Sequence, residues 1–196
     1  KIIHVSKFDW LLTNFKSGWI RILDRVKESV EEYRLLSPTG KISLIGHSSG
    51  GVMLRQYLSH NEFGSRIYNG KRYCNRLITL GSPHHAKRAT KLRNMVDMNF
   101  PGSYYSQEVD YISIAGTLDL SKNCASNFAV KTAQKSYSSI TGHKENKGDG
   151  LVPISSSLLK DSKHILLNET AHSKLFGKYW YGSKSRLKIW WEKIDF

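Results

Sequence analysis

The stretch ISLIGHSSGGVML, residues 42–54, limits the possible folds of this 196-residue chain more than any other stretch. A short apolar run leads into GHSSG, and VMLRQYLS at 52–59 then has apolar residues at helical spacing without Gly or Pro. A buried strand that turns sharply into a helix at a serine forms a nucleophile elbow. The stretch therefore predicts a strand, a strained turn at Ser48 and a helix.

The glycines around Ser48 are expected to make this turn possible. Because the chain has 15 glycines and many serines, a bare G-x-S-x-G has little weight without its flanking strand and helix. Gly46 and Gly50 have no Cβ and are expected to let the strand and the helix pass close beside a strained serine backbone. Gly51 is expected to add to that clearance.

Strand-like and helix-like segments alternate along the chain, without repeats or an evident linker, which is typical of a single α/β domain over 1–196. Strands are predicted at 1–6, 42–45, 76–81, 111–116 and 164–167, and helices at 18–36, 52–59 and 185–194. A chain of 196 residues can bury a substantial core without disulfides or metal ions. The predicted architecture is a mostly parallel sheet flanked by helices.

Three residues match the requirements of nucleophilic catalysis. A serine hydroxyl needs a base that removes its proton and a carboxylate that orients the base. Ser48, Asp149 and His172 occur in the chain order of nucleophile, acid and histidine that is typical of α/β-hydrolases. His172 lies in a loop after the last predicted strand, where functional side chains of parallel sheets are expected.

Alternatives for the acid and the histidine stay open. Asp119 directly follows a predicted strand, whereas Asp149 lies between two glycines before Leu-Val-Pro, which suits a tight turn that presents a carboxylate inward. His164 also lies beyond Asp149, but it opens a strand and is expected to be a pairing or surface residue. The backbone N–H of Ser49, after the nucleophile, is the predicted oxyanion donor.

Six short stretches, from near the first residue to near the last, carry a resemblance to a known family. They are FDW at 8–10, GHSSGG at 46–51, LGSPH at 80–84, PGSYY at 101–105, GDGLVP at 148–153 and WYGS at 180–183. In these the chain resembles the lipase-like α/β-hydrolases of cyanobacteria and chloroplasts, related to the PGAP1-like and triacylglycerol-lipase-like families. The resemblance implies an α/β-hydrolase fold, a triad of Ser48, Asp149 and His172, and an acyl ester as substrate.

The beginning of the chain departs from the pattern of this family. There a strand ending in a Gly-rich loop supplies the second oxyanion N–H, and nothing in the given sequence precedes Lys1. The expectation is an N-terminally truncated α/β-hydrolase, the alternative being that residues 6–10 supply the donor. The loss of one such donor lowers turnover on the order of a hundredfold to a thousandfold.

Segment 86–107 is a candidate cap over the substrate pocket. It is basic at first and then rich in Met, Phe and Tyr. Met95, Met98 and Tyr104 are candidates for an apolar lining that suits an acyl chain, with ordinary packing as the alternative. His47, which precedes Ser48, is a further candidate for substrate contact, with a structural role as its alternative.

The adjacent His84 and His85 raise the question of a metal site. Two neighbouring residues of a regular strand cannot both face one ion, and no third ligand is placed nearby in the sequence. No metal or other cofactor is therefore predicted.

The net charge of +14 favours an anionic partner. The basic residues are scattered, and no run of lysines is interleaved with stacking aromatics, so specific nucleic-acid binding is not predicted. Weak association with an anionic membrane surface is expected instead. Without a signal peptide or a membrane-length apolar stretch, the chain is expected to be cytoplasmic or to lie in a plastid-like compartment.

The sequence thus predicts a serine hydrolase that cleaves lipid or small acyl esters through an acyl-enzyme on Ser48. An acyltransferase would use the same residues but pass the acyl group to an alcohol. A non-catalytic basic module that binds lipid surfaces is the other alternative.

Overall fold

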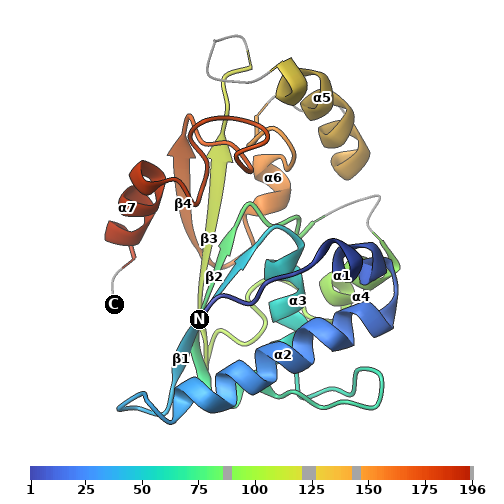
Figure 1. Cartoon of the computed structure of the whole chain (residues 1–196), viewed down its shortest axis with the longest axis vertical. Helices are drawn as coiled ribbons and strands as arrows, with labels where there is room; N and C mark the ends of the chain where they lie inside the picture. Colours follow the sequence, from blue (N-terminus) through green and yellow to red (C-terminus); the bar gives the residue numbers. More distant parts are fainter. Residues whose placement is uncertain (86–89, 121–126, 143–146, 195–196) are drawn as a thin grey trace.

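The computed structural model describes residues 1–85, 90–120, 127–142 and 147–194. Its centre is a parallel sheet of four strands in the order β1-β2-β3-β4 (Figure 1). The strands are β1 (Ile42–His47), β2 (Cys74–Leu80), β3 (Asp110–Thr117) and β4 (Lys163–Asn168). Since the spatial order equals the chain order and all pairs are parallel, the four carboxyl ends lie at one edge of the sheet.

Helices cover both faces of this sheet (Figure 1). The helical segments are α1 (Lys7–Leu11), η1 (Leu12–Asn14), α2 (Lys16–Arg34), α3 (Ser49–Leu58), η2 (Gly70–Arg72), α4 (Lys91–Asn99), α5 (Asn127–Thr141), α6 (Ile154–Ser157) and α7 (Lys184–Glu192). Figure 1 shows α5 beyond the carboxyl ends of the strands, and the helix α7 across the sheet from α2 and α3.

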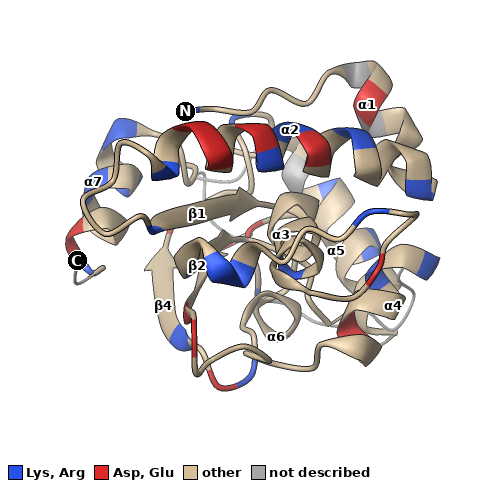
Figure 2. Ribbon diagram, turned by 90° about the horizontal axis from the view of Figure 1, so that it is seen from below, with Lys and Arg blue, Asp and Glu red and all other residues tan. Residues whose placement is uncertain are grey.

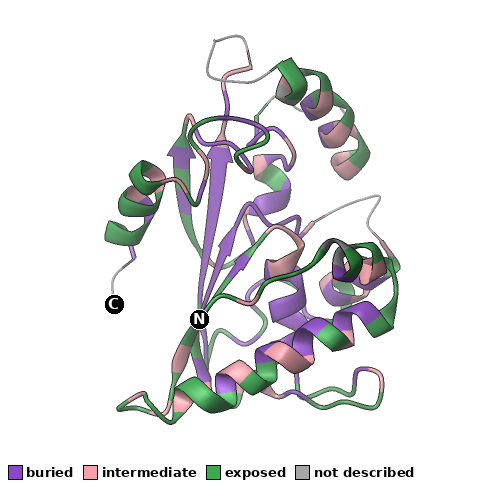
Figure 3. Cartoon of the chain, viewed as in Figure 1, coloured by how far each residue is buried: buried purple, intermediate pink, exposed green. Residues whose placement is uncertain are grey.

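Two apolar cores follow from the alternation of side chains along the strands. Leu77 belongs to the larger core, formed with residues of α2 and α3, whereas its neighbour Ile78 belongs to a second core with Trp190 of α7. Leu77 and Ile78 are both fully buried. Figure 3 shows that the inner strands are buried along nearly their whole length. The near-continuous apolar runs of β2 and β3 are therefore what a parallel sheet with two covered faces requires.

The observed elements confirm four predicted strands and the three predicted helices, with ends shifted by a few residues. The parallel sheet with helices on both faces, entered by a strand–serine–helix turn, is the predicted α/β-hydrolase fold. Across the described ranges, no helix is both long enough and apolar enough to span a membrane.

The strand predicted at 1–6 is wrong. Among the described residues this segment pairs with no strand, and it is tied to α2 by Arg25, whose Nη1 donates to the His4 carbonyl at 3.0 Å. Ile2 is 76% exposed and Val5 46% exposed. The alternation of KIIHVS resembles a strand, but a strand forms only where a neighbour satisfies its backbone, and here α2 provides the contact instead.

Part of the predicted cap segment, residues 86–89, lies outside the described residues. The described remainder contains α4, which contacts α3 and buries Leu92 and Val96 in the larger core. Phe100 and Tyr105 after it are also buried in the larger core. This part of the segment is therefore held by ordinary core packing.

Candidate active site

Ser48 lies at the turn from β1 into α3, in a conformation that L residues rarely adopt. Its φ is 55° and its ψ −134°. The Ser48 N–H donates to the Leu80 carbonyl at 3.0 Å, which fixes the turn to the end of β2. A Cβ on Gly46 would lie 2.6 Å from the Gly51 Cα, so strand and helix cross in contact directly below the serine.

The steric role predicted for Gly46 and Gly51 is confirmed, but the role predicted for Gly50 is wrong. A Cβ on Gly50 would meet no atom of the described residues within 4 Å. On Gly51 a Cβ would collide with the Ser82 side chain and lie 3.0 Å from the Thr79 methyl. Gly51 therefore faces the sheet and supplies the clearance, whereas Gly50 lies on the open side of the first turn of α3.

The N-terminus of α3 is directly adjacent to Ser48. Ser49 is the first residue of this helix, so its N–H has no partner within the helix. The helix dipole adds partial positive charge at the same point. Negative charge that develops near Ser48 Oγ would therefore be stabilised there.

Asp149 and His172 are joined by a hydrogen bond between His172 Nδ1 and Asp149 Oδ2 of 2.9 Å. Asp149 is fully buried and His172 is 4% exposed. The other carboxylate oxygen, Oδ1, accepts the N–H groups of Leu151 at 3.0 Å and Val152 at 2.8 Å. Asp149 thus sits in a tight turn in which Gly150 has a φ of 96°, and the carboxylate points inward.

Backbone hydrogen bonds connect the Asp149 loop and the His172 loop to the strand ends. The Leu118 N–H, just after β3, donates to the Gly148 carbonyl at 2.8 Å. The Thr170 N–H donates to the Thr117 carbonyl at 2.9 Å, and the His172 N–H to the Asp149 carbonyl at 2.7 Å. The distance between Asp149 and His172 is therefore fixed by the backbone as well as by the side chains.

A third side chain, that of Tyr181, completes the surroundings of Asp149. Its hydroxyl donates to Asp149 Oδ2 at 2.9 Å and accepts the Gly116 N–H at 2.7 Å. Burial, with the adjacent carboxylate, raises the pKa of Tyr181 well above its ordinary value, so the phenol stays protonated and can donate. Tyr181 belongs to the WYGS stretch noted in the sequence, but it was not predicted as a site residue.

Glycines at the ends of β2 and β3 make room for this arrangement. A Cβ on Gly81, which has a φ of 54°, would lie 2.5 Å from Asp149 Oδ2. A Cβ on Gly116 would lie 3.0 Å from the Tyr181 hydroxyl. Two of the predicted strands, 76–81 and 111–116, end in glycine. With the structure known, this shared ending is the feature of the sequence that marks space for a buried group at this edge.

His47 contacts the His172 loop. Its Nε2 lies 2.8 Å from the His172 carbonyl oxygen, and the two ring centroids are 4.7 Å apart. Since a carbonyl only accepts, Nε2 of His47 carries the proton. Neighbouring side chains remove water from the ring, and His172 would repel a positive charge, so the pKa of His47 is lowered. His47 therefore supports the backbone of His172 as a neutral imidazole.

The His172 ring packs on His47, the residue that precedes Ser48 at the carboxyl end of β1. Among the described residues no hydrogen bond joins Ser48 Oγ to His172. Such bonds are often long without substrate and shorten in the complex.

The alternative histidine, His164, lies elsewhere: its Nε2 contacts the Leu159 carbonyl at 2.8 Å. Asp119, the alternative acid, is half-buried after β3.

The candidate substrate residues from segment 86–107 have different environments. Met95 is partly buried against the larger core, Met98 is 73% exposed, and Tyr104 is 53% exposed. The apolar residues beside His172 come from other segments. Phe176 lies edge-on to the His172 ring at 6.1 Å between centroids, and Phe128 of α5 lies 5.5 Å from Phe176. The sequence analysis did not identify these two residues.

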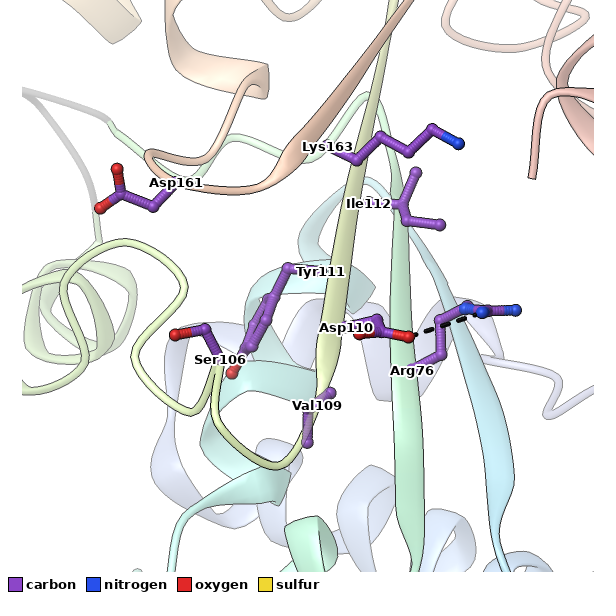
Figure 4. A pocket seen from close by; sticks show the side chains of 8 residues that line it. All are labelled: Arg76, Ser106, Val109, Asp110, Tyr111, Ile112, Asp161 and Lys163. Atoms are coloured by element: carbon purple, nitrogen blue, oxygen red, sulfur yellow. Dashed lines mark hydrogen bonds and ion pairs between the residues drawn. The ribbon is translucent and has the colours of Figure 1, made fainter. Parts of the chain in front are cut away.

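A pocket at the amino ends of β2, β3 and β4 is unrelated to this site (Figure 4). Its lining includes Arg76, Asp110 and Lys163, with Arg76 paired to Asp110 at 3.5 Å. Ligands of parallel sheets bind at the carboxyl ends of the strands, where Asp149 and His172 lie.

In the part of the chain that the structure describes, no three His, Cys, Asp or Glu side chains are grouped as metal ligands.

The chain is similar to a solved bacterial structure but to no curated protein. Among solved structures, the Bacillus licheniformis lipase BlEst2 in its mature form is similar with a TM-score of 0.46 and 18% identity, over 75% of this chain and 64% of the lipase. The matched region thus spans less than two thirds of that lipase.

A family match covers Ser48 but ends before Asp149 and His172. Residues 13–142 match the family described as "Putative serine esterase (DUF676)". This segment includes Ser48, whereas Asp149 and His172 follow it. Since the match covers more than half of the 196 residues, the chain belongs to the DUF676 family.

Proposed function

We propose that this chain is a serine esterase that cleaves carboxylic esters through an acyl-enzyme on Ser48. The observation that carries the proposal is the buried 2.9 Å hydrogen bond from His172 to Asp149, at the strand edge where Ser48 occupies a strained turn. The membership in a family described as serine esterases agrees with it. The proposal assigns Ser48 as the nucleophile, His172 as the base and Asp149 as the carboxylate that orients the base.

The hydrogen bond to Asp149 sets the tautomer of His172. An ionised carboxylate only accepts, so Nδ1 of His172 carries a proton and Nε2 has a free lone pair. In the proposed reaction Nε2 removes the Ser48 proton while Oγ attacks the ester carbonyl carbon. His172 then gives this proton to the leaving alcohol as the ester C–O bond breaks. Water, deprotonated by His172, attacks the acyl-enzyme, and Ser48 regains its proton as the carboxylic acid leaves.

The Ser49 N–H and the N-terminus of α3 are the proposed site of oxyanion stabilisation. The negative charge forms on the carbonyl oxygen next to Ser48, where the first turn of α3 presents N–H groups without helical partners. Only stabilisation that is stronger in the transition state than in the bound substrate raises turnover. A fixed helix N-terminus meets that condition, since its dipole does not need to reorient.

The surroundings of His172 favour an ester with an apolar portion. Phe176 and Phe128 provide aromatic surface beside the imidazole, with Phe128 still 50% exposed. Met95, Met98 and Tyr104 stay candidates for more distant contacts with a long acyl chain, and His47 for contacts close to the reacting bond. A series of p-nitrophenyl esters of increasing acyl length compares these contributions.

Ester hydrolysis by Ser48→Ala tests the proposal. Its kcat/KM on a short p-nitrophenyl ester is expected to fall by at least about 10⁴-fold, because the nucleophile is lost. Ser43→Ala, an exposed serine of the same strand, is the matched control and is expected to keep the parent activity. Undiminished turnover by a purified Ser48→Ala chain would refute the assignment.

A further inference from the structure

One surface of the chain combines basic side chains with exposed apolar ones. We define it as loop 173–179 together with Lys193 and the outer side of α7, which is formed by Lys184, Arg186, Leu187, Lys188 and Trp191. Residues 173–194 contain six basic residues and a single acidic one, whereas the whole chain has 30 basic and 16 acidic residues. The basic residues are Lys174, Lys178, Lys184, Arg186, Lys188 and Lys193. The surface is therefore more strongly cationic than the average of the chain.

Large apolar side chains on this surface face solvent. Leu175 is 67% exposed, Tyr179 40%, Leu187 44% and Trp191 45%. Single exposed apolar residues are normal on proteins, but here four of them lie between lysines. Protein segments that lie in the interface of a lipid bilayer typically combine Trp, Tyr and Leu with Lys and Arg. This surface has the same combination of side chains.

The loop and the helix form one continuous surface. The Arg186 guanidinium lies over the Tyr179 ring, 5.1 Å from its centroid, and Lys178 Nζ lies 5.4 Å from the same ring. The opposite side of α7 is anchored, because Trp190 is buried and its Nε1 donates to the Tyr181 carbonyl at 2.9 Å. The outer side of α7 therefore keeps a fixed orientation towards solvent.

The long helix α2 provides a comparison within the same chain. Figure 2 shows acidic and basic residues alternating along α2, whereas α7 is mainly basic. Lys27 of α2 lies 3.9 Å from Glu31, and Lys188 of α7 lies equally far from Glu192. However, α2 also contains Asp24, Glu28 and Glu32, whereas Glu192 is the one acidic residue of α7. Leu35 and Leu36, just after α2, are each 74% exposed. Exposed leucines and lysines thus occur there without a matching excess of positive charge.

We propose that this surface binds the headgroup region of anionic phospholipid bilayers. The basic side chains would be attracted by the negative surface potential, and Leu175, Leu187 and Trp191 would enter the interface beside them. The exposed leucines favour a lipid surface over a nucleic acid, which is bound by stacking rings and phosphate contacts. Leu175 follows His172 by three residues, so docking would bring the catalytic loop to the lipid. Only that last consequence rests on the proposed function.

Vesicle co-sedimentation tests the charge contribution. The Ser48→Ala chain is used throughout, so that no lipid is consumed and the result is independent of ester hydrolysis. It is expected to bind vesicles of phosphatidylcholine with phosphatidylglycerol, less so as salt rises, and to bind phosphatidylcholine alone weakly. Lys184→Gln with Lys188→Gln and Lys193→Gln should weaken binding by on the order of 10- to 100-fold.

A matched triple variant removes the same charge elsewhere. It carries Lys16→Gln and Lys27→Gln on α2, with Lys160→Gln before β4. It is expected to bind within about twofold of its parent, because attraction to the surface falls off within a Debye length. Equal losses in both triple variants would show that net charge alone controls binding, and this would overturn the proposal, as would no binding by the parent.

The apolar contribution is tested with a second pair of variants. Leu175→Ser with Leu187→Ser should weaken vesicle binding several-fold, whereas Leu35→Ser with Leu36→Ser should not. All four positions are exposed, so circular dichroism is expected to show an unchanged fold. Unaltered vesicle binding by the first pair, together with equally tight binding of a single-stranded oligonucleotide, would identify a general polyanion surface and overturn the proposal.

Discussion

Tyr181 donates a hydrogen bond to the same oxygen of Asp149 that accepts the Nδ1–H of His172, at 2.9 Å in each case. The carboxylate charge is therefore shared between an imidazole and a phenol. The phenol is itself held by the Gly116 N–H at the end of β3. In the proposed mechanism Tyr181 is thus a positioning residue, which would act on Ser48 only through Asp149 and His172.

Tyr181→Phe is expected to lower kcat on a water-soluble ester by about tenfold and to leave KM unchanged. Without the phenol, Asp149 Oδ2 loses one of its two hydrogen-bond partners, so the carboxylate no longer holds the His172 ring as firmly in the orientation that Ser48 needs. The buried Gly116 N–H also loses its partner, which costs about 1–3 kcal/mol of stability.

The split between kcat and KM distinguishes positioning from structural support. Tyr179→Phe, at an exposed neighbouring tyrosine, should leave both constants for a water-soluble ester unchanged. A Tyr181→Phe chain that loses stability but keeps the parent kcat would limit the role of Tyr181 to packing.

Asp149→Asn is expected to reduce kcat/KM by on the order of 10³- to 10⁴-fold, because the amide can impose the wrong tautomer on His172. Asp119→Asn, at the competing acid, should change it by no more than about threefold. Steady-state hydrolysis of the same ester compares the two variants. The reverse ranking would assign the acid to Asp119.

The elbow glycines should differ in stability measurements. In Gly46→Ala the new Cβ would lie 2.6 Å from the Gly51 Cα, so backbone must move, at a cost of about 1–3 kcal/mol in the free energy of unfolding. Gly50→Ala places its methyl in open space within a helix and is expected to be neutral or to stabilise by up to about 1 kcal/mol. Urea unfolding measures both, and equal destabilisation would contradict the steric assignment.

His84 is expected to make the fold sensitive to acid. Burial, the nearby Arg55 and then His85 lower the pKa of His84 well below its ordinary value. Its Nδ1 accepts from Arg55 Nη1 at 3.4 Å, which requires a neutral ring, and its Nε2 lies 3.1 Å from the Thr79 hydroxyl, to which it can donate. The folded state therefore binds fewer protons than the unfolded state below about pH 6.5, and stability falls as the pH decreases through that range.

Urea unfolding at pH 7 and pH 5 measures this effect. A buried histidine that stays neutral contributes about 2 kcal/mol to the difference between these two pH values. His84→Gln should reduce the difference by that amount, whereas His4→Gln, at an exposed position, should not change it. An unaltered difference in His84→Gln would mean that other groups cause the acid sensitivity.

Local patterns were enough to predict the elbow and the four strands of the sheet. The apolar run before Ser48 and the helical spacing after it depend only on neighbouring residues, and the same holds for the Asp-Gly turn that contains Asp149. The strand at 1–6 was predicted from the same kind of pattern and is wrong, since a strand depends on a partner that a local pattern does not show.

The missed features all depend on three-dimensional neighbours. Tyr181 reaches Asp149 across 32 residues, and nothing in its immediate sequence distinguishes it from a core tyrosine. The different roles of Gly50 and Gly51 depend on which of them faces the sheet. The aromatic pair Phe128 and Phe176 joins α5 to the loop after β4, and these two segments meet only in the folded chain.

The most direct test of the central claim is labelling by a fluorophosphonate probe, with the modified residue located by peptide mass spectrometry. The account predicts one labelled residue, Ser48, no labelling in Ser48→Ala, and labelling slowed by orders of magnitude in His172→Ala and Asp149→Asn, because both remove the activation of the serine. Labelling at another serine, or none in a well-folded sample of the parent chain, would contradict the assignment of Ser48 as an activated nucleophile.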